Sequence, residues 1–270
     1  MARRALRDLK QRSREGWPDR PTTARPSHDH GEGHERIIGS SRHDRTGGGS
    51  VSSSVATKAT TTQHAAATVG VAEHGNSAVL VTLAPGGELL DRRRIDLTQD
   101  LQTHPYHHEG SWAVGRYLNS PWARPITLGD ALALVERVRE AAAHGARAGL
   151  GALAAALPMP IARIALRVCP ELPPTIEERI TDTRAATVAD SVMYREALAT
   201  AAEARGWAVH WYDRGRVLGE AAVALGRPEV DAFLSAMGRA LGPPWQATHK
   251  LAAAAALAAG ARPVRRPPAG

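Results

Sequence analysis

The chain has 270 residues, of which 43% are apolar, with a formal net charge of +7 and one cysteine, Cys169. This length and apolar content suffice for one domain with a substantial core plus a long tail. A single cysteine excludes an internal disulfide and is typical of a reducing cytoplasm. The longest apolar run, LAAAAALAAGA at 251–261, is too short and alanine-rich to span a bilayer, so we expect a cytoplasmic protein without membrane contact.

The excess positive charge lies at the two ends of the chain. Residues 1–64 hold 12 Lys and Arg against 7 Asp and Glu, and three arginines lie in the proline-rich stretch 261–270. The first segment contains GGGSVSSSV and no apolar period, so we predict a disordered basic arm over 1–64 and a basic tail over 261–270. The nearly neutral domain at 65–260 gives no charge-based sign of a binding surface.

The stretch VGVAEHGNSAVLVTLAPGGELLDRRRIDL, residues 69–97, predicts three antiparallel strands. The strands are expected at 69–73, 77–83 and 88–96, because apolar and polar residues alternate there. His74-Gly75-Asn76 and Ala84-Pro85-Gly86-Gly87 provide the turns between them. Glu73 and His74 then lie at the mouth of the first turn.

The remaining regular elements alternate between helix and strand. Apolar residues at three- and four-residue steps predict a long helix over 128–157, with Thr127 as its cap. A strand follows over 161–169, and a capping box at Thr175 then opens helical sequence as far as 205, with a break expected near Thr187. A short strand over 207–212 and the terminal helices complete the domain. The expected fold class is α/β, with a mixed five-stranded sheet flanked by helices.

The segment 98–126 is predicted to be an irregular loop inserted between the third strand and the long helix. It carries His107, His108, Glu109 and Trp112, which we take as a candidate binding loop. Imidazole and carboxylate groups suit both metal binding and proton transfer. Adjacent residues rarely point at one ion, so an ordered surface loop with aromatic anchors is the alternative interpretation. Long loops inside compact domains are often functional.

This element order resembles the ribonuclease H-like fold, and several segments are similar to its RuvC-type Holliday-junction resolvase branch. VGVAEHGN at 69–76 resembles the opening strand and turn of these resolvases, and ALRVCPE at 165–171 resembles their central strand. The closing stretch, from WAVHWYDRGRVLG to HKLAAAAALA, resembles their last strand and terminal helix. The resemblance covers about 68–259, and the loop at 98–126 is additional.

The resemblance implies a cluster of acidic residues that holds two Mg²⁺ or Mn²⁺ ions for phosphodiester hydrolysis. The corresponding metal ligands here are Glu73, Glu171 and His249, and Ala252 stands where an aspartate is expected. His74 or His107 would carry protons. The structural alternatives are a solvated turn carboxylate for Glu73, a loop residue for Glu171, and a packing or capping histidine for His249.

The chain also resembles a bacterial protein family with the same AEHG, HHEG and GPPW signatures, and this resemblance implies no particular activity. Two hypotheses therefore lead. One is a metal-dependent, structure-selective nuclease that acts on branched or structured nucleic acid, with a homodimer among the allowed assemblies. The other is a catalytically degenerate ribonuclease H-like module that binds nucleic acid or a protein partner. An actin-like sugar- or acyl-phosphate kinase would need phosphate-binding glycine turns in two repeated halves, which the sequence lacks.

Overall fold

The structure is a computed structural model that describes residues 66–121 and 123–261. These residues belong to one compact unit of the chain. The predicted basic arm at 1–64 lies outside the described residues, and so does the tail beyond 261. No helix in the described part of the chain is long and apolar enough to cross a membrane.

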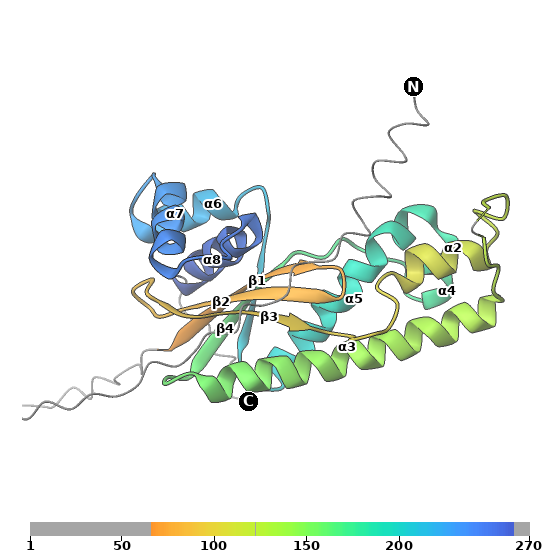
Figure 1. The fold of residues 1–270 in the computed structure, drawn as a ribbon, viewed down its shortest axis with the longest axis horizontal. Helices are drawn as coiled ribbons and strands as arrows, with labels where there is room; N and C mark the ends of the chain where they lie inside the picture. The colour runs from red at the N-terminus through yellow and green to blue at the C-terminus, as the bar shows by residue number, and fades with distance from the viewer. Residues whose placement is uncertain (1–65, 122, 262–270) are drawn as a thin grey trace, which may run out of the picture. The chain divides into compact units, whose positions relative to one another are not determined.

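A five-stranded sheet forms the centre of the domain, with the strand order β3-β2-β1-β4-β5 (Figure 1). Its strands are β1 (Ala67–His74), β2 (Ser77–Leu83), β3 (Leu89–Asp96), β4 (Ile161–Arg167) and β5 (Ala208–Tyr212). The first three pair antiparallel, while β4 is parallel to both β1 and β5. The predicted meander, the parallel central strand and the ribonuclease H-like order are confirmed.

The two turns of the meander depend on glycine. Gly75 has φ of 55° and Gly87 has φ of 83°, in the left-handed region where side chains with a Cβ are strained. The Ser77 hydroxyl also donates to the His74 carbonyl at 3.0 Å, which closes the first turn. These contacts fix the register so that Glu73 pairs with Ala78 and Gly70 pairs with Val81.

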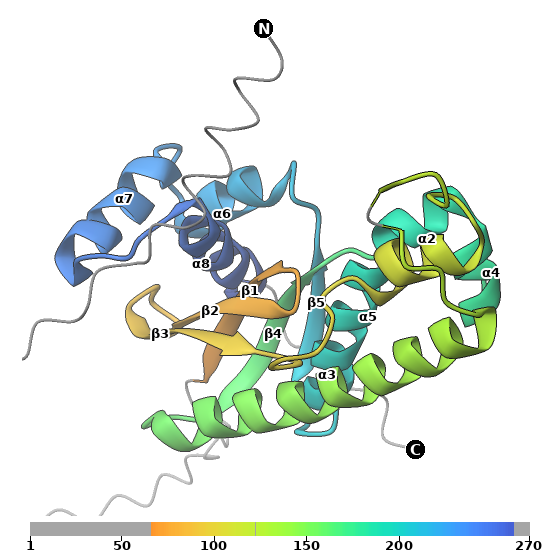
Figure 2. The ribbon, with the colours of Figure 1, turned by 45° about the vertical axis from the view of Figure 1, so that its right-hand side comes forward.

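Helices cover both faces of the sheet. They are η1 (Pro105–Glu109, a π-helical turn), α2 (Gly110–Ala113), α3 (Leu128–Ala156), α4 (Ile176–Thr181), α5 (Thr183–Glu203), α6 (Val217–Leu225), α7 (Val230–Leu241) and α8 (Ala247–Gly260). Figures 1 and 2 show α6, α7 and α8 on one side of the sheet and α3 on the other. Val69 and Val71 belong to the core with α3 and α5, whereas Ala72 belongs to the core with α6 and α8. Side chains of β1 alternate between the two faces of the sheet, so the strand contributes residues to two separate cores.

The alanine-rich helix α8 packs unusually close to β1. A Cβ at Gly70 would lie 1.8 Å from the Ala252 carbonyl oxygen and 2.6 Å from the Ala256 nitrogen, so no larger residue fits at Gly70. The alanines of α8 leave the helix with almost no side-chain thickness where it crosses the strand. The apolar run at 251–261 is therefore a packing surface of the core.

The structure corrects three expected boundaries. The segment 98–126 is not wholly irregular, because it contains η1 and α2. The helical sequence after Thr175 breaks at Asp182 and not near Thr187, because the Asp182 carboxylate caps α5 by accepting from the Ala185 backbone N–H at 2.8 Å. The strand β4 ends at Arg167, so Cys169 lies beyond it and is only partly buried.

Candidate functional site

Glu73 lies at the carboxyl end of β1 and forms a buried ion pair with Arg195 of α5. Its side chain is 6% exposed and that of Arg195 is 1% exposed. Arg195 Nε donates to Glu73 Oε1 at 2.7 Å, and Nη2 lies 2.6 Å from the same oxygen without hydrogen-bond geometry. Arg195 Nη1 donates to the Val168 carbonyl at 3.1 Å, just past β4. The arginine therefore ties the ends of two strands to α5.

Two further arginines lie at the same end of the sheet as this ion pair. Arg167 Nε lies 3.5 Å from Glu73 Oε1. Arg167 pairs in register with Tyr212 on β5, and Arg214 follows two residues later. The Tyr212 hydroxyl donates to the Val71 carbonyl at 2.8 Å, and burial is the main cause that raises its pKa, while Arg167, Arg195 and Arg214 lower it. One carboxylate and three guanidinium groups thus lie at this end of the sheet, and their formal charges sum to +2. We call these residues, Glu73, Arg167, Arg195 and Arg214, the arginine cluster.

This arrangement does not fit a two-metal site. Oε1 of Glu73 is already bound by Arg195, and Arg167 adds a second positive charge 3.5 Å from the same oxygen. Like charges at this distance repel strongly in a poorly solvated site. Across residues 66–121 and 123–261, no three His, Cys, Asp or Glu side chains lie together so that they could hold a metal ion. The predicted ligand cluster is therefore not assembled.

Both Glu171, which follows β4, and His74, the last residue of β1, are exposed. Glu171 is exposed in the loop after β4 and lines a separate pocket of about 570 Å³ together with Asp182 and Arg184. His74 is exposed at the end of β1, where its carbonyl receives the Ser77 hydroxyl. The catalytic assignment of both residues stays a prediction.

His249 lies in the first turn of α8 and is 8% exposed. Its Nδ1 accepts from the Gln246 backbone N–H at 3.1 Å, and its ring stacks on Trp245 with centroids 5.7 Å apart. Burial is the main cause that lowers its pKa, and Arg92 adds to the shift. These contacts give His249 a role in capping and packing, which was the structural alternative drawn from the sequence.

The GPPW signature fastens α8 to β3. Arg92 Nη1 donates to the carbonyls of Gly242 at 3.0 Å and Pro244 at 2.7 Å. The Trp245 ring lies directly over Gly238 of α7, where a Cβ would be 2.1 Å from the indole. The motif therefore positions the terminal helix.

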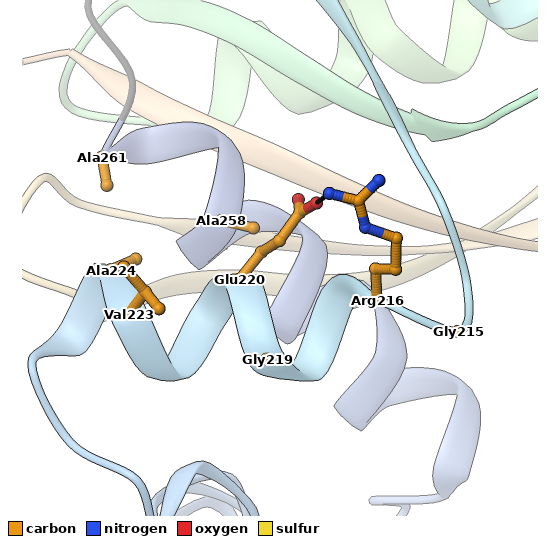
Figure 3. Close-up of a pocket in the computed structure, with 8 residues that line it drawn as sticks. All are labelled: Gly215, Arg216, Gly219, Glu220, Val223, Ala224, Ala258 and Ala261. Atoms are coloured by element: carbon orange, nitrogen blue, oxygen red, sulfur yellow. Dashed lines mark ion pairs between the residues drawn. The ribbon is translucent and has the colours of Figure 1, made fainter.

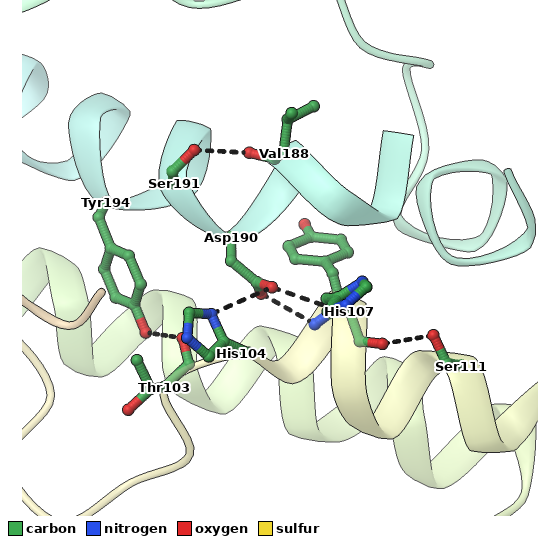
Figure 4. A network of polar contacts seen from close by, with 9 residues as sticks. Thr103, His104, His107, Ser111, Val188, Asp190, Ser191 and Tyr194 are labelled. Carbon is green, nitrogen blue, oxygen red and sulfur yellow. Dashed lines mark hydrogen bonds and ion pairs between the residues drawn. The ribbon is translucent and has the colours of Figure 1, made fainter. Parts of the chain in front are cut away.

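Asp190 of α5 holds the start of the inserted segment (Figure 4). Its side chain is 5% exposed, and its carboxylate accepts from the backbone N–H groups of Tyr106 at 2.9 Å and His107 at 3.2 Å. His104 Nδ1 lies 3.7 Å away, and burial lowers the pKa of this histidine. Burial raises the pKa of Asp190 to about 7, against the opposing effect of the two N–H groups. This anchor makes η1 a fixed part of the domain.

The four residues of the candidate binding loop divide between two environments. His107 Nδ1 is buried without a hydrogen-bond partner, beside the Asp190 anchor. His108, Glu109 and Trp112 line a cavity of about 820 Å³. The His108 and Trp112 rings lie 4.4 Å apart between centroids, and Glu109 Oε2 is also buried without a partner. The sequence prediction thus selected three residues that the fold brings together.

Another concave surface lies between α6 and α8 (Figure 3). It has a volume of about 660 Å³ and a lining of mostly glycine, alanine and valine. Its charged residues are Arg216 and Glu220, whose side chains lie 3.7 Å apart. Val223 at its edge is 82% exposed.

Sequence reasoning missed Arg195 and Asp190, although a signal was present. The apolar stripe of α5 includes Ala186, Met193 and Ala197, and Asp190 falls on the same helical spacing. A charged residue inside such a stripe is buried and needs a partner. The partners themselves could not be read, because Glu73 lies 122 residues from Arg195 and Tyr106 lies 84 residues from Asp190.

No protein-family model matches the chain, and no curated protein does. Among solved structures, the chain is similar to Thermus thermophilus RuvC in complex with a Holliday junction substrate, at 13% identity and a TM-score of 0.39, over 72% of this chain and 91% of that one. A second Thermus thermophilus RuvC structure gives 13% identity and a TM-score of 0.36, over 71% and 92%. At these values the similarity assigns neither a family nor an activity. The order and directions of the strands carry the fold assignment.

Proposed function

We propose that this chain is a ribonuclease H-like module that binds nucleic acid without cleaving it. The observation that carries the proposal is the ion pair between Glu73 and Arg195 at the carboxyl end of β1. The first-strand carboxylate, which the resemblance to resolvases assigns to a metal, is neutralised here by a buried arginine. Glu171 and His249, the other two residues of that assignment, make separate contacts.

The arginine cluster suits a phosphate group better than a metal ion. Arg195 compensates the charge of Glu73, which leaves Arg167 and Arg214 as the two remaining cations of the arginine cluster. The Arg167 side chain is 33% exposed and Arg214 is exposed, so both can meet a ligand from solvent. Guanidinium groups bind phosphate oxygens in bidentate fashion and favour nucleic-acid backbones. Metal-free binding of the sugar-phosphate backbone is the chemistry that such a site supports.

The test is binding and cleavage of a four-way DNA junction, measured on the full chain by fluorescence anisotropy and by gel assay. We expect binding in EDTA, no gain from Mn²⁺, and no cleavage in Mg²⁺ or Mn²⁺. Arg214→Ala should weaken binding and lower the salt dependence of log K by about one, because one phosphate contact is lost. Arg147→Ala, an exposed arginine on α3, is the matched control and should change neither value.

Two results would contradict the proposal. One is cleavage of the junction that requires Mn²⁺ and is lost in the Glu73→Gln variant. This result would support the hypothesis of a metal-dependent nuclease instead. The other is junction binding that responds equally to Arg214→Ala and Arg147→Ala, which would reduce the interaction to general positive charge.

A further inference from the structure

The cavity beside the HHEG segment combines three kinds of binding group. We call it the HHEG cavity. Its lining residues come from the inserted segment and from the first turns of α3, and they include His108, Glu109, Trp112, Arg124, Asp130 and Arg137. None of these belongs to the arginine cluster. Its volume of about 820 Å³ lies in the range of small-molecule sites.

Two aromatic rings, a glutamate with one unsatisfied oxygen and two arginines belong to the lining of this cavity. The rings are those of His108 and Trp112, with centroids 4.4 Å apart. Glu109 contributes a buried oxygen, Oε2, that has no hydrogen-bond partner. Arg124 and Arg137 are exposed residues of the lining. A buried acceptor without a donor is costly, and such atoms are uncommon in folded proteins unless a ligand or water satisfies them.

We infer that the HHEG cavity binds an unpaired guanine nucleotide. The base stacks on Trp112, its Watson–Crick edge donates to Glu109, and its phosphate meets Arg137. Stacking on aromatic side chains is the common way in which proteins hold unpaired bases. Arginine supplies the phosphate contact.

The carboxylate selects guanine among the four bases. Guanine presents two adjacent donors, N1–H and the exocyclic amino group, which match the two oxygens of a carboxylate. Adenine and cytosine place a ring acceptor next to their amino group, and uracil places carbonyls on both sides of its single N–H, so each would set a lone pair against Glu109. The terminal torsion of a glutamate is broad, so the carboxylate can turn Oε2 toward the base.

The inference rests on the proposed function for one point only, the source of the nucleotide. If the arginine cluster binds a nucleic-acid backbone, an unpaired guanine of that strand is one source. A free guanine nucleotide has the same chemistry and is the other source.

The experiment measures binding of GMP, guanosine, AMP and UMP to the full chain by isothermal titration calorimetry. We expect GMP to bind at least tenfold more tightly than AMP or UMP, since the competing bases lose a hydrogen bond to a charged group. Oligonucleotides with one unpaired guanine or one unpaired adenine distinguish a strand from a free nucleotide. Tighter binding of the guanine oligonucleotide than of GMP identifies the strand as the source, and the reverse identifies the free nucleotide.

Three substitutions test the individual contacts. Glu109→Gln keeps the shape and removes the charge, and should weaken GMP binding about tenfold to a hundredfold. Trp112→Ala should weaken it by a similar factor through lost stacking, whereas Trp211→Ala, a 41% exposed tryptophan on β5, should not. Arg137 is exposed on α3, so its replacement by alanine should leave the fold intact. Arg137→Ala should weaken the binding of GMP but not of guanosine, which has no phosphate.

The inference is overturned if neither GMP nor the guanine oligonucleotide binds, if AMP binds as well as GMP, or if Glu109→Gln and Arg137→Ala both leave GMP binding unchanged. Its failure is separable from that of the proposed function. If GMP binds and the junction does not, only the proposed function of the arginine cluster is contradicted. If the junction binds and no preference for guanine is found, only the inferred guanine site in the HHEG cavity is contradicted.

Discussion

The glutamate of the arginine cluster and the glutamate of the HHEG cavity differ in whether other protein groups satisfy their carboxylate oxygens. Glu73 is 6% exposed, and one of its oxygens contacts three guanidinium nitrogens within 3.5 Å. Glu109 has an oxygen that is as inaccessible to water yet has no partner. The first carboxylate is satisfied within the protein and mainly stabilises the fold, while the second belongs to a residue that lines a cavity and has one oxygen that no protein group satisfies. The inferred guanine site therefore uses the carboxylate that the protein leaves unsatisfied, and not the one at the expected catalytic position.

The largest expected effect comes from breaking the buried ion pair. Arg195→Met leaves Glu73 buried without its partner, so the free energy of unfolding should fall by about 3 to 5 kcal/mol. Urea denaturation followed by circular dichroism measures this loss. The double variant Arg195→Met with Glu73→Leu should recover most of it, because no unpaired charge remains. A loss under 1 kcal/mol in the single variant would contradict a structural role for the pair.

The Asp190 anchor should make the stability of the domain depend on pH. Its pKa is raised to about 7 in the folded state, whereas an unfolded aspartate titrates near 4. The folded state then holds the proton more tightly, so the contribution is complete below about pH 4 and disappears as the pH rises through 7. The change is on the order of a few kcal/mol. Asp190→Asn should flatten this slope in denaturation series from pH 4 to 8.

A matched control separates the anchor from general titration of the protein. His104 and Glu109 also influence Asp190, so the slope belongs to this group of residues as a whole. Asp100→Asn changes an exposed aspartate in the segment before η1 and should leave the slope as in the unmodified chain. Equal slopes in all three proteins would remove Asp190 as the cause.

The smallest effect tests the comparison itself through two identical substitutions. Glu73→Gln should lower the free energy of unfolding by about 1.5 to 3 kcal/mol, since it weakens hydrogen bonds between charged groups. Glu109→Gln should change it by less than about 1 kcal/mol, or raise it, because an unsatisfied charge is removed. Thermal unfolding of both variants at pH 7 supplies the measurement. Equal losses would mean that the two carboxylates are in equivalent environments.

The sheet could be predicted from the sequence because its determinants are local. Alternation in β1 to β4, glycine at the two turns, and the caps at Thr127 and Thr175 act over a few residues, and all appear in the structure. The break at Asp182 was missed because helical sequence continues directly on both sides of it, as α4 and α5. The aspartate cap is evident only from its observed hydrogen bond.

The candidate site was predicted only in part, because its contacts join distant segments. The grouping of His108, Glu109 and Trp112 followed from their proximity in the sequence. The partner of Glu73 did not, since Arg195 comes from a helix whose approach to β1 depends on the whole core. The resemblance to resolvases implied a metal ligand at Glu73, and the neighbouring charges, which the sequence does not reveal, decide what that carboxylate binds.

The alanine-rich face of α8 raises the question of what sets the helix's position along β1. Consecutive alanines offer nearly identical surfaces, so a shift by one turn would preserve most apolar contacts of the run. The polar contacts at its two ends are not interchangeable in this way. Lys250 Nζ donates to Asp231 Oδ1 at 3.0 Å and to Ser235 Oγ at 2.8 Å, and Arg163 donates to the carbonyl of Ala259. These polar contacts at the two ends of α8 therefore set the position of the whole helix along β1, including its alanine-rich middle.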